Sequence, residues 1–317
     1  MTILLTGAGG FLGSHVLEAL LAATHDEPIH VTDSFTHNGA TDRIVDAVRG
    51  RWARVEVITH DLTVPFSPAR LEQLRDVDTI IHVASLCQVD QSIRQPREFV
   101  LANVASTLTM LEAARTLGVR RYIHMSTDEV YGDAEAASGH HPSSPYAASK
   151  AAQEDLCHAY RRTFGVPVQI VNSGNMLGER QSMLAFTPRL CRMVLAGEIV
   201  PIHTHGGEPG RRWYTYVGNV ARYLVALALG KVPEAERHHL PGQAQLSNLE
   251  LAQTVAWALG RSLTYELVEA DTVRPGYDTS YPRLEDNPHW RPHVRLDEAI
   301  ERTARWFAER TSWLAAA

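Results

Sequence analysis

Short apolar runs recur through the first 173 residues and alternate with longer amphipathic stretches. Each run is bounded by polar residues or glycine, which predicts buried strands at residues 3–6, 29–32, 55–58, 78–85, 121–125 and 168–172. Residues 11–23, the stretch after Pro96 and the stretch after Pro145 have the apolar spacing of helices. Strands that alternate with helices are typical of a parallel sheet. The pattern therefore predicts an α/β fold with a doubly wound parallel sheet.

The alternation weakens after residue 173, and the remaining chain is richer in proline. Ser247 and Glu250 form a capping-box pattern that predicts the start of a helix, and residues 217–229 and 296–309 predict two more. We therefore expect two domains. The first covers residues 1–173, with a return of about 214–240, and the second is a smaller C-terminal α/β lobe, mainly residues 174–317.

A glycine-rich turn follows the first predicted strand. Gly7, Gly10 and Gly13 lie between that strand and the next helix, where glycines let the backbone approach a pyrophosphate at a helix N-terminus. Asp33 ends the second strand, twenty residues beyond Gly13. Its carboxylate suits the two hydroxyls of an adenosine ribose and repels a 2′-phosphate, although a helix or turn cap is the alternative role. The arrangement predicts a Rossmann-like domain that binds NAD rather than NADP.

Tyr146 and Lys150 lie four residues apart on the helix that Pro145 opens, so both side chains share one helix face. A neighbouring ammonium favours the phenolate and should lower the pKa of the tyrosine. Such a pair can take a proton from a hydroxyl group while a hydride leaves the same carbon. Taken alone, this spacing is more often a solvated helix face. Ser126 and Thr127 favour the catalytic interpretation, because they end a predicted strand, where α/β sheets place their active sites.

Two adjacent carboxylates, Asp128 and Glu129, follow Thr127 directly. Different surroundings can make one carboxyl group a base and its neighbour an acid. The alternative is that both only cap the next helix and supply its first-turn charge. We expect both to be catalytic.

The composition argues against several other classes of protein. A chain of 317 residues with 44% hydrophobic residues, 21% charged residues and a net charge of −6 is ordinary for a globular protein and does not favour nucleic acid. No apolar run approaches the ~20 residues that a membrane-spanning helix needs, and no basic leader precedes the glycine-rich turn. Three widely spaced cysteines suit a reducing cytoplasm and show no metal-ligand spacing. We expect a cytoplasmic protein without a metal, membrane or nucleic-acid partner.

The glycine-rich turn, the Ser-Thr-Asp-Glu-Val-Tyr-Gly run at residues 126–132 and the Tyr146/Lys150 pair together resemble the extended, nucleotide-sugar-modifying branch of the short-chain dehydrogenase/reductase superfamily. Within it, the run is most similar to the dTDP-glucose 4,6-dehydratases, and the resemblance extends from residue 3 to about residue 307. It implies a homodimer formed by the helices after Pro96 and Pro145. It also implies that NAD is held by Gly7, Gly10, Phe11, Leu12, Gly13, Asp33, Asp61, Leu62, Ala84, Ser85, Asn103, Ser126, Tyr146 and Lys150.

The resemblance further implies a reaction on the sugar of a nucleoside-diphosphate sugar. Tyr146 deprotonates the 4-hydroxyl while hydride passes from carbon 4 to NAD, Thr127 binds the developing oxyanion and Lys150 binds the nicotinamide ribose. Glu129 then removes the proton on carbon 5, and Asp128 protonates the departing 6-hydroxyl. Hydride returns to carbon 6, which gives a 4-keto-6-deoxy sugar.

For the substrate, the resemblance implies contacts by Gln88, Asn175, Arg212, Arg274 and Tyr277. The same pocket departs from the dehydratase pattern at Leu86, Cys87 and Gln88, where a histidine is lost, and at Leu184, Ala185, Trp213 and Thr279. The base and the sugar therefore stay open. Two other functions stay open as well: a nucleotide-sugar 4-epimerase or decarboxylase with the same carbon-4 oxidation, and a non-catalytic NAD-binding regulatory protein.

Overall fold

The computed structural model describes residues 1–37, 39–132, 139–269, 284 and 286–315. The chain divides into two compact units. The first comprises Met1–Val130, Ser144–Asn172 and Val220–His239, and the second comprises Tyr131–Ser143, Ser173–Asn219 and Leu240–Ala317.

The first unit is built on a seven-stranded sheet with the strand order β11-β6-β5-β4-β1-β2-β3. Its strands are β1 (Ile3–Thr6), β2 (Ile29–Asp33), β3 (Val55–Thr59), β4 (Thr79–His82), β5 (Arg121–Thr127), β6 (Val168–Ser173) and β11 (Arg237–Leu240). β1 pairs in parallel with β2 and β4, and the β2–β3 and β4–β5 pairs are parallel too. Every residue of β1 and β4 is buried, as expected for strands covered on both faces. The predicted Rossmann-like sheet is confirmed.

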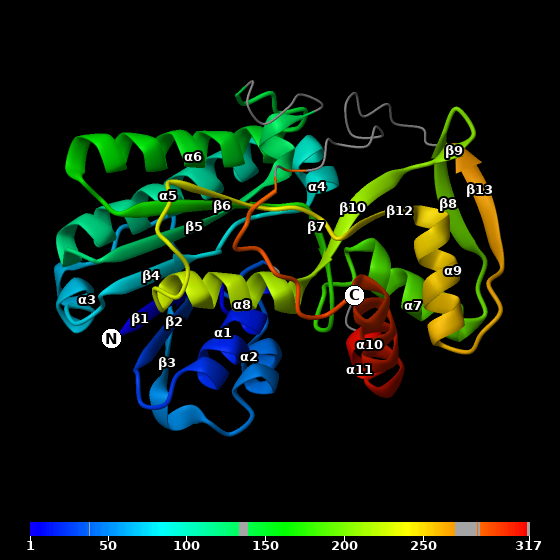
Figure 1. Ribbon diagram of the computed structural model, residues 1–317, viewed down its shortest axis with the longest axis horizontal. Coiled ribbons are helices and arrows are strands. Elements are labelled where there is room, and N and C mark those ends of the chain that lie inside the picture. Colours follow the sequence, from blue (N-terminus) through cyan, green and yellow to red (C-terminus); the bar gives the residue numbers. More distant parts are fainter. Residues whose placement is uncertain (38, 133–138, 270–283, 285, 316–317) are drawn as a thin grey trace. The chain divides into compact units, whose positions relative to one another are not determined.

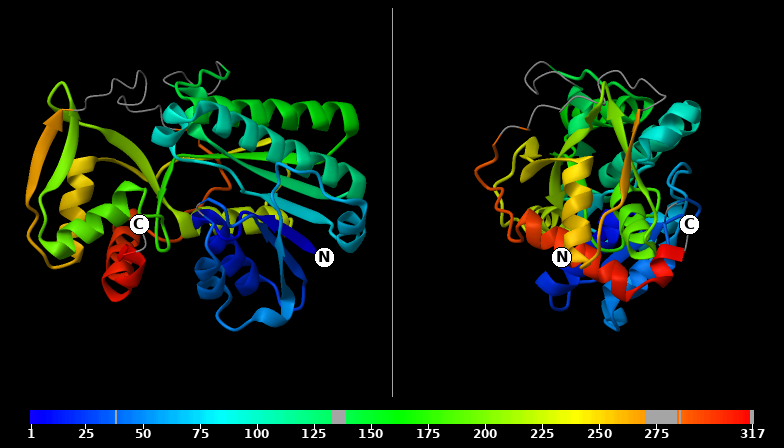
Figure 2. Two further views of the ribbon diagram at one scale, coloured as in Figure 1. Left: turned by 180° about the vertical axis from the view of Figure 1, so that it is seen from behind. Right: turned by 90° about the vertical axis from the view of Figure 1, so that its right-hand side faces the viewer.

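Helices cover both faces of this sheet (Figure 1). They are α1 (Phe11–Ala23), α2 (Thr41–Val48), α3 (Pro68–Gln73), α4 (Val89–Arg94), α5 (Pro96–Leu117), α6 (Pro145–Phe164) and α8 (Val217–Ala228), with short 3₁₀ turns η1 (Trp52–Arg54) and η2 (Asp128–Tyr131). α5 and α6 lie on one face and α1 and α2 on the other, and the view from behind in Figure 2 shows the same two layers. This layering follows from the connections, because right-handed crossovers on either side of β1 send helices to opposite faces.

The second unit contains two three-stranded sheets with the orders β12-β10-β7 and β13-β8-β9. Its elements are β7 (Asn175–Leu177), α7 (Phe186–Ala196), β8 (Val200–His205), β9 (Glu208–Pro209), β10 (Arg211–Tyr216), β12 (Ala244–Ser247), α9 (Asn248–Ala258), β13 (Tyr265–Glu269), α10 (Leu296–Glu309) and α11 (Ser312–Ala315). The predicted capping box is present: the Ser247 hydroxyl accepts from the Glu250 amide at 3.1 Å, and the Glu250 carboxylate accepts from the Ser247 amide at 2.7 Å. Helix α10 has the predicted bounds.

The apolar residues of α5 lie in two different environments. Phe99 and Leu111 are fully buried in the core, whereas Val100, Leu101 and Leu108 are 37%, 55% and 42% exposed. One face of α5 therefore packs on the sheet and another presents apolar side chains at the surface. Among the helices of the described residues, none has the length and apolar character needed to cross a membrane.

Candidate active site

The glycine-rich turn joins β1 to α1, and close approaches of the backbone require its glycines. Gly7 has a φ of +70°, in the left-handed region that glycine adopts without strain. A Cβ atom on Gly7 would lie 2.8 Å from the Ala84 Cα atom, and one on Gly13 would lie 1.9 Å from the Gly7 carbonyl oxygen. The Gly10 amide donates to that carbonyl at 2.9 Å. The turn thus leads into the N-terminus of α1, whose backbone amides suit a phosphate group and whose first residues are Phe11 and Leu12.

The Asp33 carboxylate lies against this turn. Its Oδ2 atom accepts a hydrogen bond from the Gly9 amide at 3.0 Å, and its Oδ1 atom accepts one from the Phe35 amide at 3.0 Å. A Cβ atom on Gly39 would come within 2.3 Å of Oδ1, so the glycine there leaves room for the carboxylate. In a dinucleotide site, the glycine turn and the helix N-terminus bind the pyrophosphate, and such a carboxylate binds the ribose hydroxyls. The residues present fit such a ligand without a 2′-phosphate.

Four further candidate cofactor residues follow two strands of the sheet: Asp61 and Leu62 follow β3, and Ala84 and Ser85 follow β4. The Asp61 Oδ1 atom accepts from the amide and the hydroxyl of Thr63, both at 2.9 Å, and Leu62 is buried in the core. Ala84 packs against Gly7, and its amide donates to the Thr6 hydroxyl oxygen at 3.1 Å. Ser85 comes next in the same loop, and its hydroxyl donates to the Leu86 carbonyl at 3.3 Å. These positions lie at the carboxyl ends of neighbouring strands, on the edge where the glycine turn also lies.

Asn103 of α5 clamps the loop after β4. Its Oδ1 atom accepts from the Leu86 amide at 2.8 Å, and its Nδ2 atom donates to the Leu86 carbonyl at 3.0 Å and to the Ser149 hydroxyl at 2.8 Å. Ser149 in turn donates to the Tyr146 carbonyl at 2.7 Å. Asn103 therefore links the loop that carries Gln88 to the first turns of α6, and in this structure its amide is engaged with protein groups.

Helix α6 carries the tyrosine–lysine pair. It starts with a side-chain cap, because the Ser144 hydroxyl accepts a hydrogen bond from the Ala147 amide at 3.1 Å. Tyr146 is half-buried, whereas Lys150 is only 3% exposed. The Lys150 Nζ atom donates to the Met125 carbonyl oxygen at 2.6 Å, which ties the helix to β5 just before its carboxyl end.

The carboxyl end of β5 carries the remaining candidate catalytic residues. Ser126, Thr127, Asp128 and Glu129 are all buried, with exposed fractions between 4% and 8%. The Thr127 Oγ1 atom lies 3.2 Å from Asp128 Oδ1 and accepts from the Glu129 amide at 3.3 Å. The threonine hydroxyl thus caps η2, whose first two residues are the carboxylates.

The pKa of Tyr146 differs from the expectation. Burial raises this pKa well above its usual value, and nearby Glu129, Cys87 and Asp128 raise it further, while a hydrogen bond with Thr127 lowers it. The predicted lowering is therefore wrong, because burial and acidic neighbours dominate around the phenol. The finding also shows that two carboxylates and a hydroxyl lie close enough to the phenol to act on its ionisation.

Two candidate substrate residues lie in the second unit. Asn175 of β7 is half-buried and pairs with Tyr214 of β10. Arg212 is half-buried and lies two residues before Tyr214 on the same strand, so their side chains point to one face of the sheet. Gln88 lies in the first unit, directly before α4. Arg274 and Tyr277 lie outside the described residues.

Comparisons with known proteins agree with this geometry. A sequence model of the NAD dependent epimerase/dehydratase family matches residues 3–238. The chain belongs to this family. Among its curated relatives, the dTDP-glucose 4,6-dehydratase of an Actinoplanes species is 31% identical over 330 residues, which cover 99% of both chains. The dTDP-glucose 4,6-dehydratase of Escherichia coli is 29% identical over 350 residues, which cover 99% of this chain and 95% of the relative.

Solved structures of family members show the same fold. The dTDP-glucose 4,6-dehydratase of Streptomyces venezuelae, solved with NAD bound, has a TM-score of 0.87 at 31% identity and covers 99% of this chain and 98% of its own. The UDP-glucose 4-epimerase of Thermus thermophilus, solved in complex with NAD, has a TM-score of 0.82 at 28% identity and covers 97% of this chain and 99% of its own. Dehydratases and epimerases of the family therefore share the architecture, and the fold alone does not separate the two reactions.

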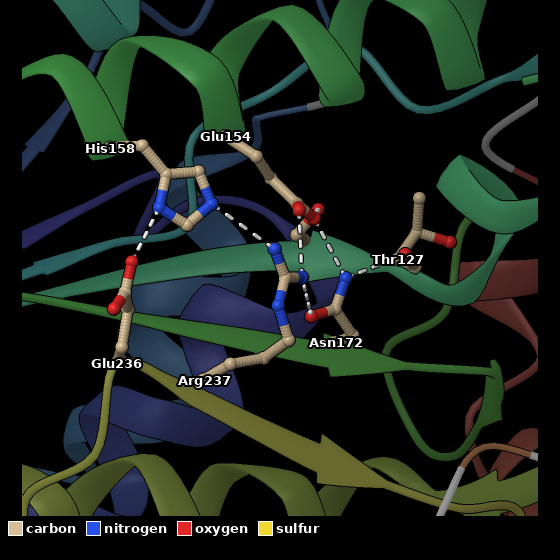
Figure 3. Close-up of polar contacts among 7 residues, drawn as sticks. Thr127, Glu154, His158, Asn172, Glu236 and Arg237 are labelled. Carbon is tan, nitrogen blue, oxygen red and sulfur yellow. Dashed lines mark hydrogen bonds and ion pairs between the residues drawn. The ribbon is translucent and has the colours of Figure 1, made fainter. Parts of the chain in front are cut away.

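Three residues beside the catalytic strand end were not predicted from the sequence (Figure 3). Glu154 and Asn172 are buried and contact Ser126 and Thr127, and the half-buried Arg237 contacts both of them. One signal was available, since Glu154 follows Lys150 by four residues and so lies on the same face of α6. Nothing local marks Asn172 or Arg237, because their relation to Glu154 depends on the pairing of distant strands.

Proposed function

We propose that this protein is an NAD-dependent nucleotide-sugar 4,6-dehydratase that forms a 4-keto-6-deoxy sugar nucleotide. The observation that carries the proposal is the pair of buried carboxylates, Asp128 and Glu129, both of which act on the pKa of the Tyr146 phenol. Epimerisation at carbon 4 needs one base for one hydroxyl, whereas elimination of water across carbons 5 and 6 needs a further base and a further acid. The similarity to dehydratases along the whole chain supports the same reaction.

In this proposal NAD is held by the glycine turn, by Asp33 at the adenosine ribose and by Tyr146 and Lys150 at the nicotinamide ribose. When bound, NAD accepts hydride from carbon 4 of the sugar and gives it back at carbon 6. The loop after β4, fixed by Asn103, lines the same edge of the sheet. A carboxylate at Asp33 disfavours NADP, since its extra phosphate would meet a negative charge.

The oxidation at carbon 4 uses three residues of the first unit. Tyr146 takes the proton of the 4-hydroxyl, Thr127 donates a hydrogen bond to the developing oxyanion, and the Lys150 ammonium stabilises the charge that forms on the phenol. Tyr146 is half-buried, and the buried Lys150 is held in place by the Met125 carbonyl.

The elimination uses the two carboxyl groups. The 4-ketone acidifies the proton on carbon 5, which Glu129 removes. Asp128 protonates the 6-hydroxyl, which leaves as one water. When hydride is added at carbon 6, a proton returns to carbon 5. The different surroundings of two adjacent carboxyl groups can assign one of them as base and the other as acid.

The two units take different tasks in this proposal. The first, residues 1–173 with the return near 214–240, binds NAD, and the lobe of mainly residues 174–317 binds the nucleotide sugar. Arg212 suits a diphosphate because its guanidinium makes forked hydrogen bonds to phosphate oxygens, and Asn175 shares the sheet with it. Gln88, Arg274 and Tyr277 complete the proposed substrate contacts.

We also propose a homodimer built from α5 and α6, and a place in the cytoplasm. The exposed apolar residues of α5, with Phe164 of α6 at 48% exposure, provide a surface for the first. The second suits the three cysteines, which are all free thiols.

The proposed function is tested by incubating the purified protein with a panel of dTDP- and UDP-sugars and following the products by mass spectrometry. We expect loss of one water from one substrate, and no loss with the Tyr146→Phe variant as control. A product of unchanged mass and inverted carbon 4 would favour the 4-epimerase, which the similarity to the epimerase of Thermus thermophilus keeps as second candidate. No reaction across the panel, from protein that retains NAD, would favour the regulatory alternative.

A further inference from the structure

A network of polar and charged side chains lies beside the carboxyl end of β5 (Figure 3). At its centre is Glu154 of α6, which has no exposed surface. The network continues from Glu154 through Arg237 of β11 to His158. His158 in turn contacts Glu236 at the protein surface (Figure 3). A buried carboxylate is costly unless it is paired and hydrogen-bonded, so its contacts indicate what it does.

Three groups bind the Glu154 carboxylate. Its Oε1 atom accepts from the Ser126 hydroxyl at 2.5 Å and from the Asn172 side-chain amide at 2.7 Å. Its Oε2 atom lies 2.7 Å from Arg237 Nη1. Arg237 Nη1 also donates to the Asn172 oxygen at 2.7 Å, so the carboxylate, the amide and the guanidinium form a closed triangle. One guanidinium nitrogen thus binds both the carboxylate and the amide, and charge-assisted hydrogen bonds of this length are strong.

Side chains of α6 and β6 hold the last residues of β5. Lys150 binds the carbonyl of Met125, Glu154 binds the hydroxyl of Ser126, and Asn172 donates to the carbonyl of Thr127 at 2.9 Å. Three successive residues are therefore held by side chains of α6 and β6. The position of the Thr127 hydroxyl depends on these backbone anchors, since a strand end has no further ladder partners to define it.

The same carboxylate lies on the face of α6 that carries Lys150, four residues earlier. Burial lowers the pKa of Lys150 to about 8, and Glu154 is the largest influence that opposes this shift. Other titratable groups facing Lys150 are Cys157 of α6, Cys87 of the loop after β4, His82 of β4 and His124 of β5. Among these groups, Glu154 supplies the buried negative charge that favours the ammonium.

We infer that Glu154 is a positioning residue of the active site, which anchors the Ser126–Thr127 strand end together with Asn172 and Arg237 and serves as the counter-charge of Lys150. The inference rests on the proposed function only for its effect on turnover. The anchoring and the charge of Lys150 are properties of the protein by itself, and they can be measured without substrate.

The sequence offers a direct measurement, because Lys150 and Lys231 are the chain's two lysines. NMR of protein that carries isotope-labelled lysine should therefore show two side-chain signals, with the exposed Lys231 as internal reference. In Glu154→Gln we expect the titration midpoint of Lys150 to fall by about one pH unit or more, as expected for loss of a close opposite charge. A midpoint unchanged from the wild type would overturn the counter-charge role.

Turnover provides the second readout. If Glu154 only stabilised the fold, Glu154→Gln would reduce the amount of active enzyme and leave its pH profile in place. For a positioning residue we expect kcat to fall about 10- to 100-fold with KM nearly unchanged. The pH at which the profile levels off should also fall, together with the titration midpoint of Lys150. A normal kcat with an unshifted profile would overturn the anchoring role.

Two further variants keep the test decisive. Glu154→Gln leaves Arg237 without its carboxylate, which can unfold the protein, so the double variant Glu154→Gln/Arg237→Met removes both charges and should show the same shift of Lys150. Glu72→Gln is the matched control: its carboxylate binds Arg75 at the surface of α3, and its loss should leave Lys150 and turnover unchanged. If the wild type turns over no nucleotide sugar, the proposed function fails, while the Lys150 titration still decides the counter-charge role.

Discussion

The Lys150 ammonium donates a 2.6 Å hydrogen bond to the carbonyl oxygen of Met125. The lysine of the pair is thus bound to the backbone of β5, and burial lowers its pKa to about 8. The pKa of Tyr146 is raised instead, by burial and by the neighbouring acids. The two residues therefore titrate in an order that limits the pH range in which both have the required charge.

This order predicts the pH dependence of the carbon-4 oxidation. Only the ionised phenol accepts a proton, so the rate should rise with pH through the neutral range and level off above about pH 8, where Lys150 loses its charge as fast as the phenol ionises. Single-turnover rates across pH measure this, with Tyr146→Phe as an inactive control that still binds substrate. A rate independent of pH between about 6 and 9 would contradict the assignment of Tyr146 as the base.

Features that depend on neighbours in the chain were predictable from the sequence. The capping box at Ser247 and the bounds of α10 follow from local side chains and apolar spacing, and both were found. The grouping of Thr127, Asp128 and Glu129 at a strand end was predictable for the same reason, since the residues are consecutive. The raised pKa of Tyr146 was not, because burial depends on what the rest of the chain packs around the phenol.

Features that depend on residues far apart in the sequence could not be predicted from it. Glu154 of α6 and Arg237 of β11 are far apart in the sequence. They meet only because α6 packs on the sheet in which β11 is the neighbour of β6. Asn103 shows a related effect. The resemblance implies a cofactor contact, but the described structure shows its amide bound to Leu86 and Ser149, a contact set that no spacing in the sequence indicates.

Asp33 should determine the choice of cofactor. Its carboxylate is held beside the glycine turn by the amides of Gly9 and Phe35, so a 2′-phosphate on the ribose would meet a fixed negative charge. We expect cofactor released by denaturation to be NAD, identified by chromatography; mainly NADP would refute the assignment. In Asp33→Asn the affinity for NADP relative to NAD should rise about tenfold or more, which corresponds to about 1.4 kcal/mol.

The exposed face of α5 should mediate dimerisation. Leu101 is 55% exposed and Leu108 is 42% exposed, two helical turns apart on the same side, and burying such residues stabilises association. Sedimentation at micromolar concentration should give twice the mass of the 35.1 kDa chain, and Leu101→Asp should shift the protein toward the monomer. Trp257→Asp changes a residue that is 74% exposed on α9 and should leave the mass unchanged. A wild-type mass near that of one chain would rule out the dimer.

His82 should make the fold sensitive to acid. The histidine is buried between the hydroxyls of Thr6 and Thr107, at 2.8 Å and 3.2 Å, and burial lowers its pKa from 6.5 to about 3. Between these two values the unfolded chain binds a proton that the native state does not. The free energy of unfolding should therefore fall as the pH falls through this window, by about 1.4 kcal/mol per pH unit from this residue.

A comparison with His82→Gln isolates this contribution. Glutamine keeps a donor and an acceptor for the two threonines but does not titrate. Urea unfolding at several pH values should show the stability gap between the wild type and the variant changing in the variant's favour as the pH falls below 6.5. Parallel curves for the two proteins would show that His82 is not the titrating group.

Substitution of the two carboxylates next to Thr127 gives the clearest test between the dehydratase and the epimerase. Glutamine at position 129 keeps the size of glutamate but cannot take the carbon-5 proton. Loss of a general base typically costs 10²- to 10⁴-fold, which corresponds to roughly 3–5 kcal/mol of barrier. In Glu129→Gln we therefore expect absorbance of reduced nicotinamide to accumulate after mixing with the true substrate, while release of water slows by about that factor.

Asp128→Asn tests the acid of the same step. Its amide cannot protonate the departing 6-hydroxyl, so water release should slow while the oxidation at carbon 4 proceeds, since Tyr146 and Lys150 are unchanged. Both carboxylates raise the pKa of Tyr146, so either variant should also lower that pKa and make the oxidation less dependent on alkaline pH. A variant that lost water release through misfolding would lose the oxidation as well, which distinguishes the two causes. If both variants turned over the substrate at nearly the normal rate, the carboxylates would only stabilise the first turn of η2. The carbon-4 oxidation would then serve an epimerase.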